Sequence, residues 1–223
     1  MDSTIVIPRR MAGLPRDRHG RPAPWFVAWI GGEPDHRVVA PGKVQDAVRF
    51  GCCWLCGEPL GANRAFVIGP MCAITRTTSE PPSHRECAVY AARACPFLTT
   101  PRMVRRPNRL PDGYTEPPGV MLKRNPGVAL VCVTRSYLPE RHPGHGYLFR
   151  LDLAAPTAAL WFAQGREATR AEAIESLDSG MPLLREVAEA EGEWAVRDLE
   201  DARADVQRFL PQPAPQQEGT RHA

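Results

Sequence analysis

The stretch that decides the fold is residues 51–95, GCCWLCGEPLGANRAFVIGPMCAITRTTSEPPSHRECAVYAARAC. It contains two pairs of potential metal ligands: Cys53 and Cys56 in CWLCG, and His84 and Cys87 in SHREC. Two thiolates separated by two residues can bind one ion if the backbone between them makes a tight turn, and Gly57 permits that turn. The pattern therefore predicts a tetrahedral metal site with three sulfur ligands and one imidazole nitrogen.

The second pair fits the first turn of a helix. His84 and Cys87 are three residues apart, so both side chains would point to the same side of that turn. Ser83 directly before them is a favoured N-cap residue, and Glu86 stands three residues further on, as in a capping box. The two prolines before Ser83 disfavour an earlier start. We expect a helix that begins at Ser83 and carries the last two ligands.

Residues 64–77, RAFVIGPMCAITRT, lie between the two pairs. Two short β-branched runs separated by Gly-Pro predict a β-hairpin. A cysteine turn, a hairpin and a ligand-bearing helix in this order resemble the treble-clef class of zinc fingers, over about residues 50–96. The resemblance implies structural Zn²⁺ with four protein ligands and no position for water. The alternative is that these cysteines are buried residues without a metal.

Composition limits the class of protein. The chain has 223 residues, of which 43% are hydrophobic and 24% charged, as in soluble globular proteins. Its 24 prolines predict short elements joined by many loops. Seven cysteines, an odd number, without a signal-peptide pattern predict a reducing compartment, so we expect a cytoplasmic protein. No apolar run is long enough to cross a bilayer, and no membrane partner is expected.

The sequence predicts an α+β fold in five segments. They are a basic N-terminal arm (1–23), a zinc-binding treble-clef lobe flanked by short strands (24–96), a Pro/Arg-rich linker (97–118), a small β-sheet lobe with C-terminal helices (119–210) and a disordered tail (211–223). In the zinc lobe, an aromatic run before Gly31-Gly32 predicts a hairpin, and residues 43–50 predict a short helix that ends at Gly51.

In the lobe at 119–210, alternating and β-branched patterns predict strands at 126–137, 146–153 and 157–165. Thr169 and Glu172 have capping-box spacing and open a helix that we expect Gly180 to close. Pro182 suits the first turn of a second helix, and a third is expected over about 193–210.

Charge is unevenly distributed along the chain. The first 21 residues hold five arginines and two aspartates, whereas acidic residues outnumber arginines in the last third. Arg102, Arg105 and Arg106, which follow the predicted zinc helix, are the best candidates to contact phosphates of DNA or RNA. The alternatives are that they pair with the acidic C-terminal helices, or that the basic segments are solvated loops.

His142 and His145 form an H-x-x-H pattern in the predicted loop LPERHPGHG. Two imidazoles at this spacing could bind a metal, or one could act as a general base. The sequence places no third ligand beside them, and Glu140 is a weak candidate. The alternative is an exposed loop with two histidines.

Cys72, Cys95 and Cys132 are expected to be small buried apolar residues, and Cys52, directly before Cys53, is expected to point away from the site. Cys72 falls in the predicted hairpin, and Cys95 ends the predicted zinc helix. Cys95 lies about 16 Å along the helix from His84, so it cannot share that ion. A second metal held by Cys72 and Cys95 is the alternative.

Several enzyme classes are excluded by missing motifs: the chain has no P-loop, GxGxxG, GxSxG or HExxH. HNH-type nucleases also bracket an active site with two zinc-binding pairs, and that resemblance implies a histidine base between the pairs. Residues 57–83 contain no histidine, and their only acidic residues are Glu58 and Glu80. A zinc deaminase is disfavoured because no PCxxC follows His84-Arg-Glu86.

Two hypotheses remain. The first is a zinc-stabilised, non-enzymatic protein that binds nucleic acid or a protein partner through its arginine-rich segments. The second is a metal-assisted hydrolase or nuclease, related to the HNH type, that uses His142 and His145. The CWLCG stretch also resembles bacterial and phage zinc-finger proteins of no assigned activity.

Overall fold

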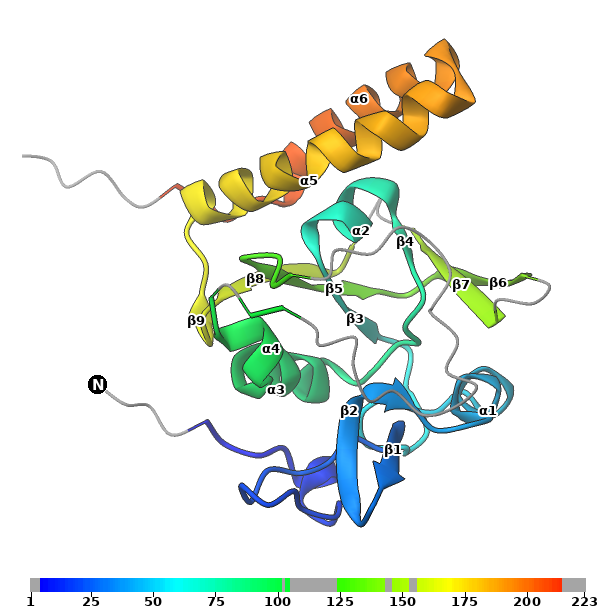
Figure 1. The fold of residues 1–223 in the computed structure, drawn as a ribbon, viewed down its shortest axis with the longest axis vertical. Coiled ribbons are helices and arrows are strands. Elements are labelled where there is room, and N and C mark those ends of the chain that lie inside the picture. Colours follow the sequence, from blue (N-terminus) through cyan, green and yellow to red (C-terminus); the bar gives the residue numbers. More distant parts are fainter. Residues whose placement is uncertain (1–4, 102, 105–123, 143–145, 153–155, 214–223) are drawn as a thin grey trace, which may run out of the picture.

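The computed structural model describes residues 5–101, 103–104, 124–142, 146–152 and 156–213. This part of the chain is a mixed α+β fold with small antiparallel sheets and a pair of C-terminal helices (Figure 1). The sheets have the strand orders β1-β2, β3-β5-β8-β9 and β4-β7-β6. The α+β class is therefore confirmed.

The N-terminal part contains a short 3-10 helix η1 (Arg9–Met11), a hairpin of β1 (Val27–Ile30) and β2 (Glu33–Val39), and helix α1 (Lys43–Phe50). Gly31 and Gly32 turn the hairpin with φ of 60° and 84°, which glycine adopts without strain. Gly51 ends α1 in the left-handed region, with its N–H bonded to the carbonyl of Ala47. The hairpin and the helix predicted here are both confirmed.

The hairpin predicted over residues 64–77 is wrong. Only β3 (Arg64–Ile68) is a strand of the expected kind; helix α2 (Pro70–Thr75) and the two-residue strand β4 (Thr77–Thr78) follow it. Proline suits the first position of a helix, where no N–H is needed, so Gly69-Pro70 opens a helix and not a hairpin turn. β3 pairs with β5 and β4 pairs with β7, so each strand finds its partner far along the chain.

The four-stranded sheet joins the two predicted lobes. β5 (Ala129–Thr134) pairs with β3 on one side and with β8 (Ala158–Ala163) on the other, and β9 (Arg166–Glu167) completes the sheet. All six residues of β5 are buried. Helix α3 (Arg85–Ala94) covers one face and α2 the other (Figure 1). β3, which lies between the two ligand pairs in sequence, is thus an edge strand of a sheet whose other strands come from residues 129–167.

The loop predicted after the first strand of the later lobe is partly wrong. Residues Tyr137–His142 form β6, which pairs with β7 (Gly146–Leu151). β6 is the edge of its sheet, a position that tolerates Pro139 because the missing N–H would face solvent. An ion pair between Glu140 and Arg150 links the two strands. His142 is consequently the last residue of a strand.

The two helices predicted around Gly180 are one helix. α5 (Arg170–Glu191) continues through Gly180 and Pro182, and α6 (Glu193–Asp205) packs beside it, followed by the 3-10 turn η2 (Val206–Phe209). A Cβ atom on Gly180 would lie 2.7 Å from Met71 Cγ, so glycine is needed there for close packing on α2 and not as a helix stop. The predicted capping box of Thr169 and Glu172 is confirmed.

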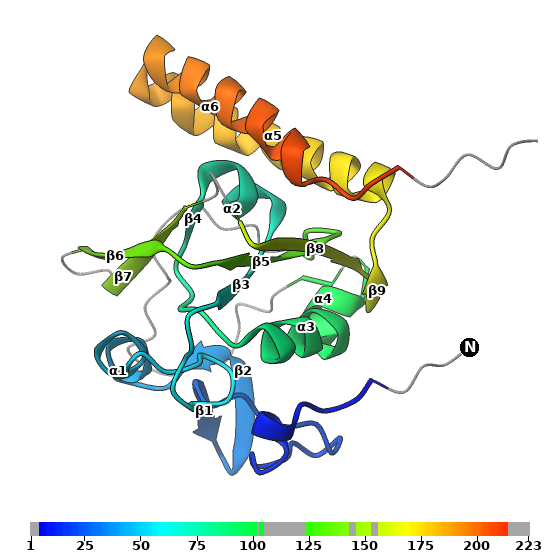
Figure 2. The same cartoon turned by 180° about the vertical axis from the view of Figure 1, so that it is seen from behind.

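The described residues bury a large apolar core and, apart from it, a smaller cluster that contains Cys53, Cys56 and Cys87. The larger apolar core lies between the sheets and the helices α2, α5 and α6; its most buried large side chains include Phe66, Ile74, Leu130, Phe149 and Leu177. The N-terminal segment and the β1-β2 hairpin lie on the opposite side of the four-stranded sheet from α5 and α6 (Figure 2). Among the described residues, no helix has the length and apolarity needed to cross a bilayer.

Candidate metal centre

The four predicted ligands come together. Cys53 and Cys56 lie in the turn after α1, His84 immediately precedes α3, and Cys87 is in the first turn of that helix. All four side chains are buried, and their ligand atoms lie within 4.8 Å of one another. Cys56 Sγ is 3.4 Å from His84 Nδ1. The described residues contain no other group of three or more His, Cys, Asp or Glu side chains arranged to hold an ion.

The cysteine turn is fixed by its own backbone. The Gly57 N–H donates to the Cys53 carbonyl at 2.8 Å, and the Cys53 N–H donates to the Glu58 carbonyl at 2.8 Å. Gly57 has φ of 78°, and a Cβ atom there would lie 2.6 Å from the Trp25 ring. Conformation and space both require glycine at this position. The N–H groups of Cys56 and His84 point at Cys53 Sγ, at 3.5 Å and 3.3 Å, and favour a thiolate there.

Backbone pairing holds the second ligand pair in place. Ser83 exchanges two hydrogen bonds with Ala65 of β3, at 2.8 Å and 2.7 Å, and the Trp54 N–H donates to the Pro82 carbonyl at 3.0 Å. These bonds attach the residues before α3 to both the sheet and the cysteine turn. The distance between the two ligand pairs is therefore set by main-chain contacts.

The predicted helix start at Ser83 is wrong. His84 is the N-cap residue, with extended backbone (φ −66°, ψ 148°), and no side chain caps this end. Because the Ser83 backbone pairs with β3, the chain enters the helix one residue later than its local pattern suggests. Glu86 makes no capping bond and instead accepts a hydrogen bond from Arg10 Nε at 3.1 Å.

The imidazole of His84 is oriented by a second contact. Its Nε2 lies 3.0 Å from the Pro59 carbonyl oxygen, which can only accept a hydrogen bond. Nε2 therefore carries the proton, and Nδ1, which faces Cys56, keeps its lone pair. A carbonyl that orients a histidine in this way is typical of metal-ligating imidazoles.

The three sulfurs cannot all be ionised without a cation beside them. Hydrogen bonds from the thiols of Cys56 and Cys87 lower the pKa of Cys53. The same contact with Cys53 raises the pKa of Cys56 to about 11 and raises that of Cys87 further. A divalent cation would remove this conflict by stabilising all three thiolates. The close approach of the three sulfur atoms is therefore expected for a site that binds a cation.

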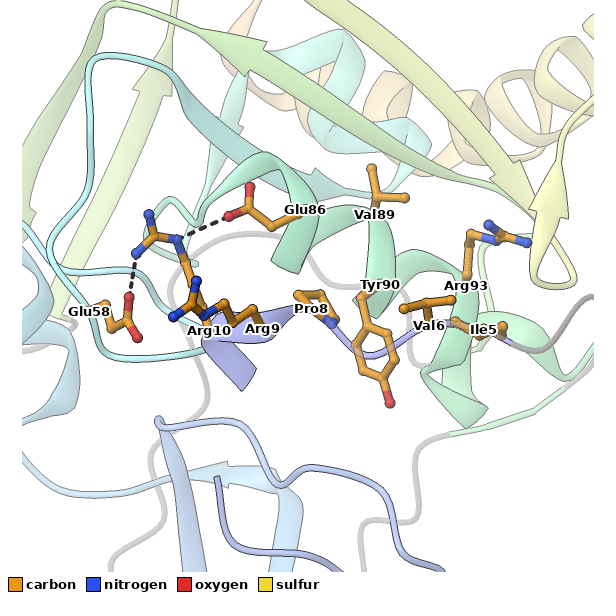
Figure 3. A pocket seen from close by; sticks show the side chains of 10 residues that line it. All are labelled: Ile5, Val6, Pro8, Arg9, Arg10, Glu58, Glu86, Val89, Tyr90 and Arg93. Carbon is orange, nitrogen blue, oxygen red and sulfur yellow. Dashed lines mark hydrogen bonds and ion pairs between the residues drawn. The ribbon is translucent and has the colours of Figure 1, made fainter. Parts of the chain in front are cut away.

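The N-terminal segment covers the candidate metal centre. Met11 is 1% exposed and packs with Cys53, Cys56 and Cys87. Arg10 forms ion pairs with Glu58, next to the cysteine turn, and with Glu86, between the last two ligands (Figure 3). Apolar packing and ion pairing therefore attach residues 5–23 of the predicted basic arm to both ligand-bearing elements. Its partners are 48 and 76 residues away, so no local pattern reveals them.

Most of the other candidate site residues lie outside the part of the chain that the structure describes. Arg102, Arg105, Arg106 and His145 lie outside the described residues. His142 pairs with Gly146 at the end of the β6-β7 hairpin and belongs to no potential metal group among the described residues. Val104 and Arg124, which flank residues 105–123, form an antiparallel bridge. The two described residues that border 105–123 thus lie side by side.

The remaining cysteines are separate from the site. Cys72 lies in α2 and not in a hairpin strand, and Cys95 caps the end of α3. Neither belongs to a potential metal group in the part of the chain described. Burial raises the pKa of Cys72 to about 11 and that of Cys132 to about 12, so both remain protonated thiols at neutral pH. The structure offers no support for a second metal at Cys72 and Cys95.

No protein-family model, no curated protein and no solved structure matches this chain.

Proposed function

We propose that this protein is a zinc-stabilised, non-enzymatic binding protein whose arginine-rich segments contact nucleic acid. The observation that carries the proposal is the buried cluster of three thiols and one imidazole. Cys53, Cys56, His84 and Cys87 would hold the ion. Thiolate with imidazole is a donor set suited to Zn²⁺, and four protein ligands complete its tetrahedral shell.

A structural role for the metal is supported by the closed ligand set. Catalytic zinc sites generally keep one position for water or substrate, with three protein ligands. Here the donors are all supplied by the protein, and Met11 packs over them. When bound, the ion would contribute Coulombic and coordination energy that ties the cysteine turn to α3.

Nucleic acid is the favoured partner because exposed arginines without a carboxylate partner are available. In the described part of the chain they include Arg18, Arg49 and Arg85. Arg102, Arg105 and Arg106 lie outside the described residues and are neighbours in sequence of Val104, which forms a bridge with Arg124. A group of guanidinium charges is the usual means of contacting phosphates, with an affinity that falls steeply with salt. A protein partner is the alternative ligand for the same segment.

The hydrolase hypothesis gains no observation in its favour. His142 ends an edge strand, and no pair of donors joins it within the described residues. A general base needs an orienting partner and a water within reach, and a metal-assisted mechanism needs further ligands.

The test is binding of the full-length, zinc-loaded protein to labelled single-stranded and duplex DNA and to RNA, measured by fluorescence anisotropy over a range of salt concentrations. Replacing Arg102, Arg105 and Arg106 by glutamate should weaken binding and reduce the slope of log K against log[salt] by about three. The matched control replaces three exposed arginines outside that segment by glutamate: Arg135, Arg141 and Arg197. Binding that is absent, independent of salt, or equally weakened in both triple variants would reject the nucleic-acid proposal and leave the protein partner.

A further inference from the structure

A groove of about 880 Å³ lies between the N-terminal segment and helix α3 (Figure 3). One wall is formed by Ile5, Val6 and Pro8, and the other by Val89, Tyr90 and Arg93. We infer that this groove binds an extended peptide that carries acidic side chains. This interaction is distinct from the nucleic-acid contacts proposed above.

The backbone of the N-terminal wall is open for pairing. Residues 5–7 belong to no helix or strand, and their peptide groups form no hydrogen bond with any described residue. Ile7 packs on the metal-centre cluster, whereas the neighbouring Val6 is 82% exposed, as expected for alternating side chains in an extended chain. An extended segment with free N–H and C=O groups can pair with an incoming peptide strand.

The apolar lining favours a peptide over a phosphate backbone. Ile5, Val6, Pro8 and Val89 offer contacts to aliphatic side chains, which a nucleic-acid backbone lacks. Alternating side chains of a bound strand would place every second residue against this surface. The groove therefore matches a peptide with apolar residues on one face.

The charges of the groove indicate acidic side chains on the other face of that peptide. Arg10 is already paired with Glu58 and Glu86, but Arg9 is exposed and has no acidic partner among the described residues. Arg93 of α3 also lines the groove. Complementary charge at the rim of an apolar groove selects partners of the opposite sign.

The experiment measures binding of a labelled, end-capped peptide of about eight residues that alternates valine and glutamate to the full-length, zinc-loaded protein. We expect saturable binding, and none of the valine–lysine version. Arg9→Glu should weaken binding about tenfold, because attraction becomes repulsion. Arg18→Glu, the same charge change on an exposed arginine that does not line the groove, should change it by less than about twofold.

A second pair of variants tests the apolar contact. Val6→Asp should weaken binding, and Leu138→Asp, at an exposed leucine on β6, should not. Neither side chain is buried, so both variants should fold. The inference is overturned if the acidic peptide does not bind, if both arginine variants lose affinity equally, or if the lysine peptide binds as well. If an oligothymidylate displaced the peptide, the groove would be a nucleic-acid site, and this result would also overturn the inference.

Discussion

The region around the metal centre and the region around the four-stranded sheet are stabilised in different ways. Near the metal the most buried side chains are small or sulfur-containing, such as Cys53, Cys87 and Met11, whereas the sheet region buries Phe66, Phe149 and Leu177. Without an ion, the first interior would hold three crowded thiols and an imidazole in place of apolar groups. Burial of apolar surface can stabilise the second region directly, whereas an ion held by the four ligand side chains would stabilise the first.

The largest difference between the regions should follow from Cys56→Ser. Structural zinc contributes about 10–16 kcal/mol in small zinc-binding domains, so loss of one ligand should release the metal and unfold residues 5–60. Hydrogen exchange should rise there first and less in β5, β8 and α5. Cys72→Ser, which removes a thiol outside the ligand group, is the control and should retain one metal per chain. An equal rise in exchange across both regions would contradict the comparison.

The complementary change is Leu177→Ala, in the apolar core. Leu177 is fully buried, and truncation should cost about 2–5 kcal/mol because transfer energy is lost and a cavity remains. Denaturant unfolding measures this cost, and metal content should be unchanged. Val187→Ala, at a partly exposed position of the same helix, should cost less than about 0.5 kcal/mol. A loss of metal in the Leu177 variant would show that the two interiors are one cooperative unit.

A smaller effect is expected at the start of α5. The Thr169 side chain accepts from the Glu172 N–H, and hydrogen bonds with Arg166 and Thr169 lower the pKa of Glu172 to about 2. Thr169→Ala should cost about 1 kcal/mol at neutral pH. A lowered carboxyl pKa stabilises the fold fully above its unfolded value of about 4.5, and this contribution disappears as the pH falls towards 2.

The measurement is the stability difference between the wild type and Glu172→Gln as a function of pH. It should be constant near neutral pH and shrink between about pH 4.5 and the folded pKa of about 2. Zinc content, followed in parallel, reports protonation of the metal ligands separately. A difference that stays constant on acidification would show that the charge of Glu172 does not support the cap.

The smallest effect should come from Arg10→Ala. Its ion pairs with Glu58 and Glu86 are exposed, so they should contribute little to global stability. They nevertheless attach the N-terminal segment to both ligand-bearing elements. We expect zinc transfer to a chelator to accelerate a few fold at low salt, and the difference to fade as salt screens the pairs. Arg9→Ala, an adjacent exposed arginine without these pairs, should leave the transfer rate unchanged.

Local sequence predicted those features whose physical cause is local. The spacing of Cys53 and Cys56 with Gly57 after them defines a turn, and Gly31-Gly32 and Gly51 define a hairpin turn and a helix end. The Thr169–Glu172 capping box also lies within one helical turn. Such features need only a few neighbouring residues, so they can be predicted without knowledge of the rest of the fold.

The wrong predictions arose where tertiary contacts outweigh local sequence. The β-branched residues after Gly69 predict a second strand paired with β3, but the partner of β3 is β5, more than 60 residues further along the chain. Gly180 resembles a helix stop, but its lack of a side chain allows α5 to approach Met71. Local propensity is weaker than such tertiary contacts, so packing decided both cases.

The sequence by itself determined which four residues could bind one ion, because ligand chemistry and spacing are properties of short segments. Only the tertiary structure decided what surrounds them: Met11 over the sulfurs, the Pro59 carbonyl on His84, and Arg10 between Glu58 and Glu86. These contacts join residues far apart in the chain. Such contacts form only when the whole chain has folded, so no local pattern specifies them.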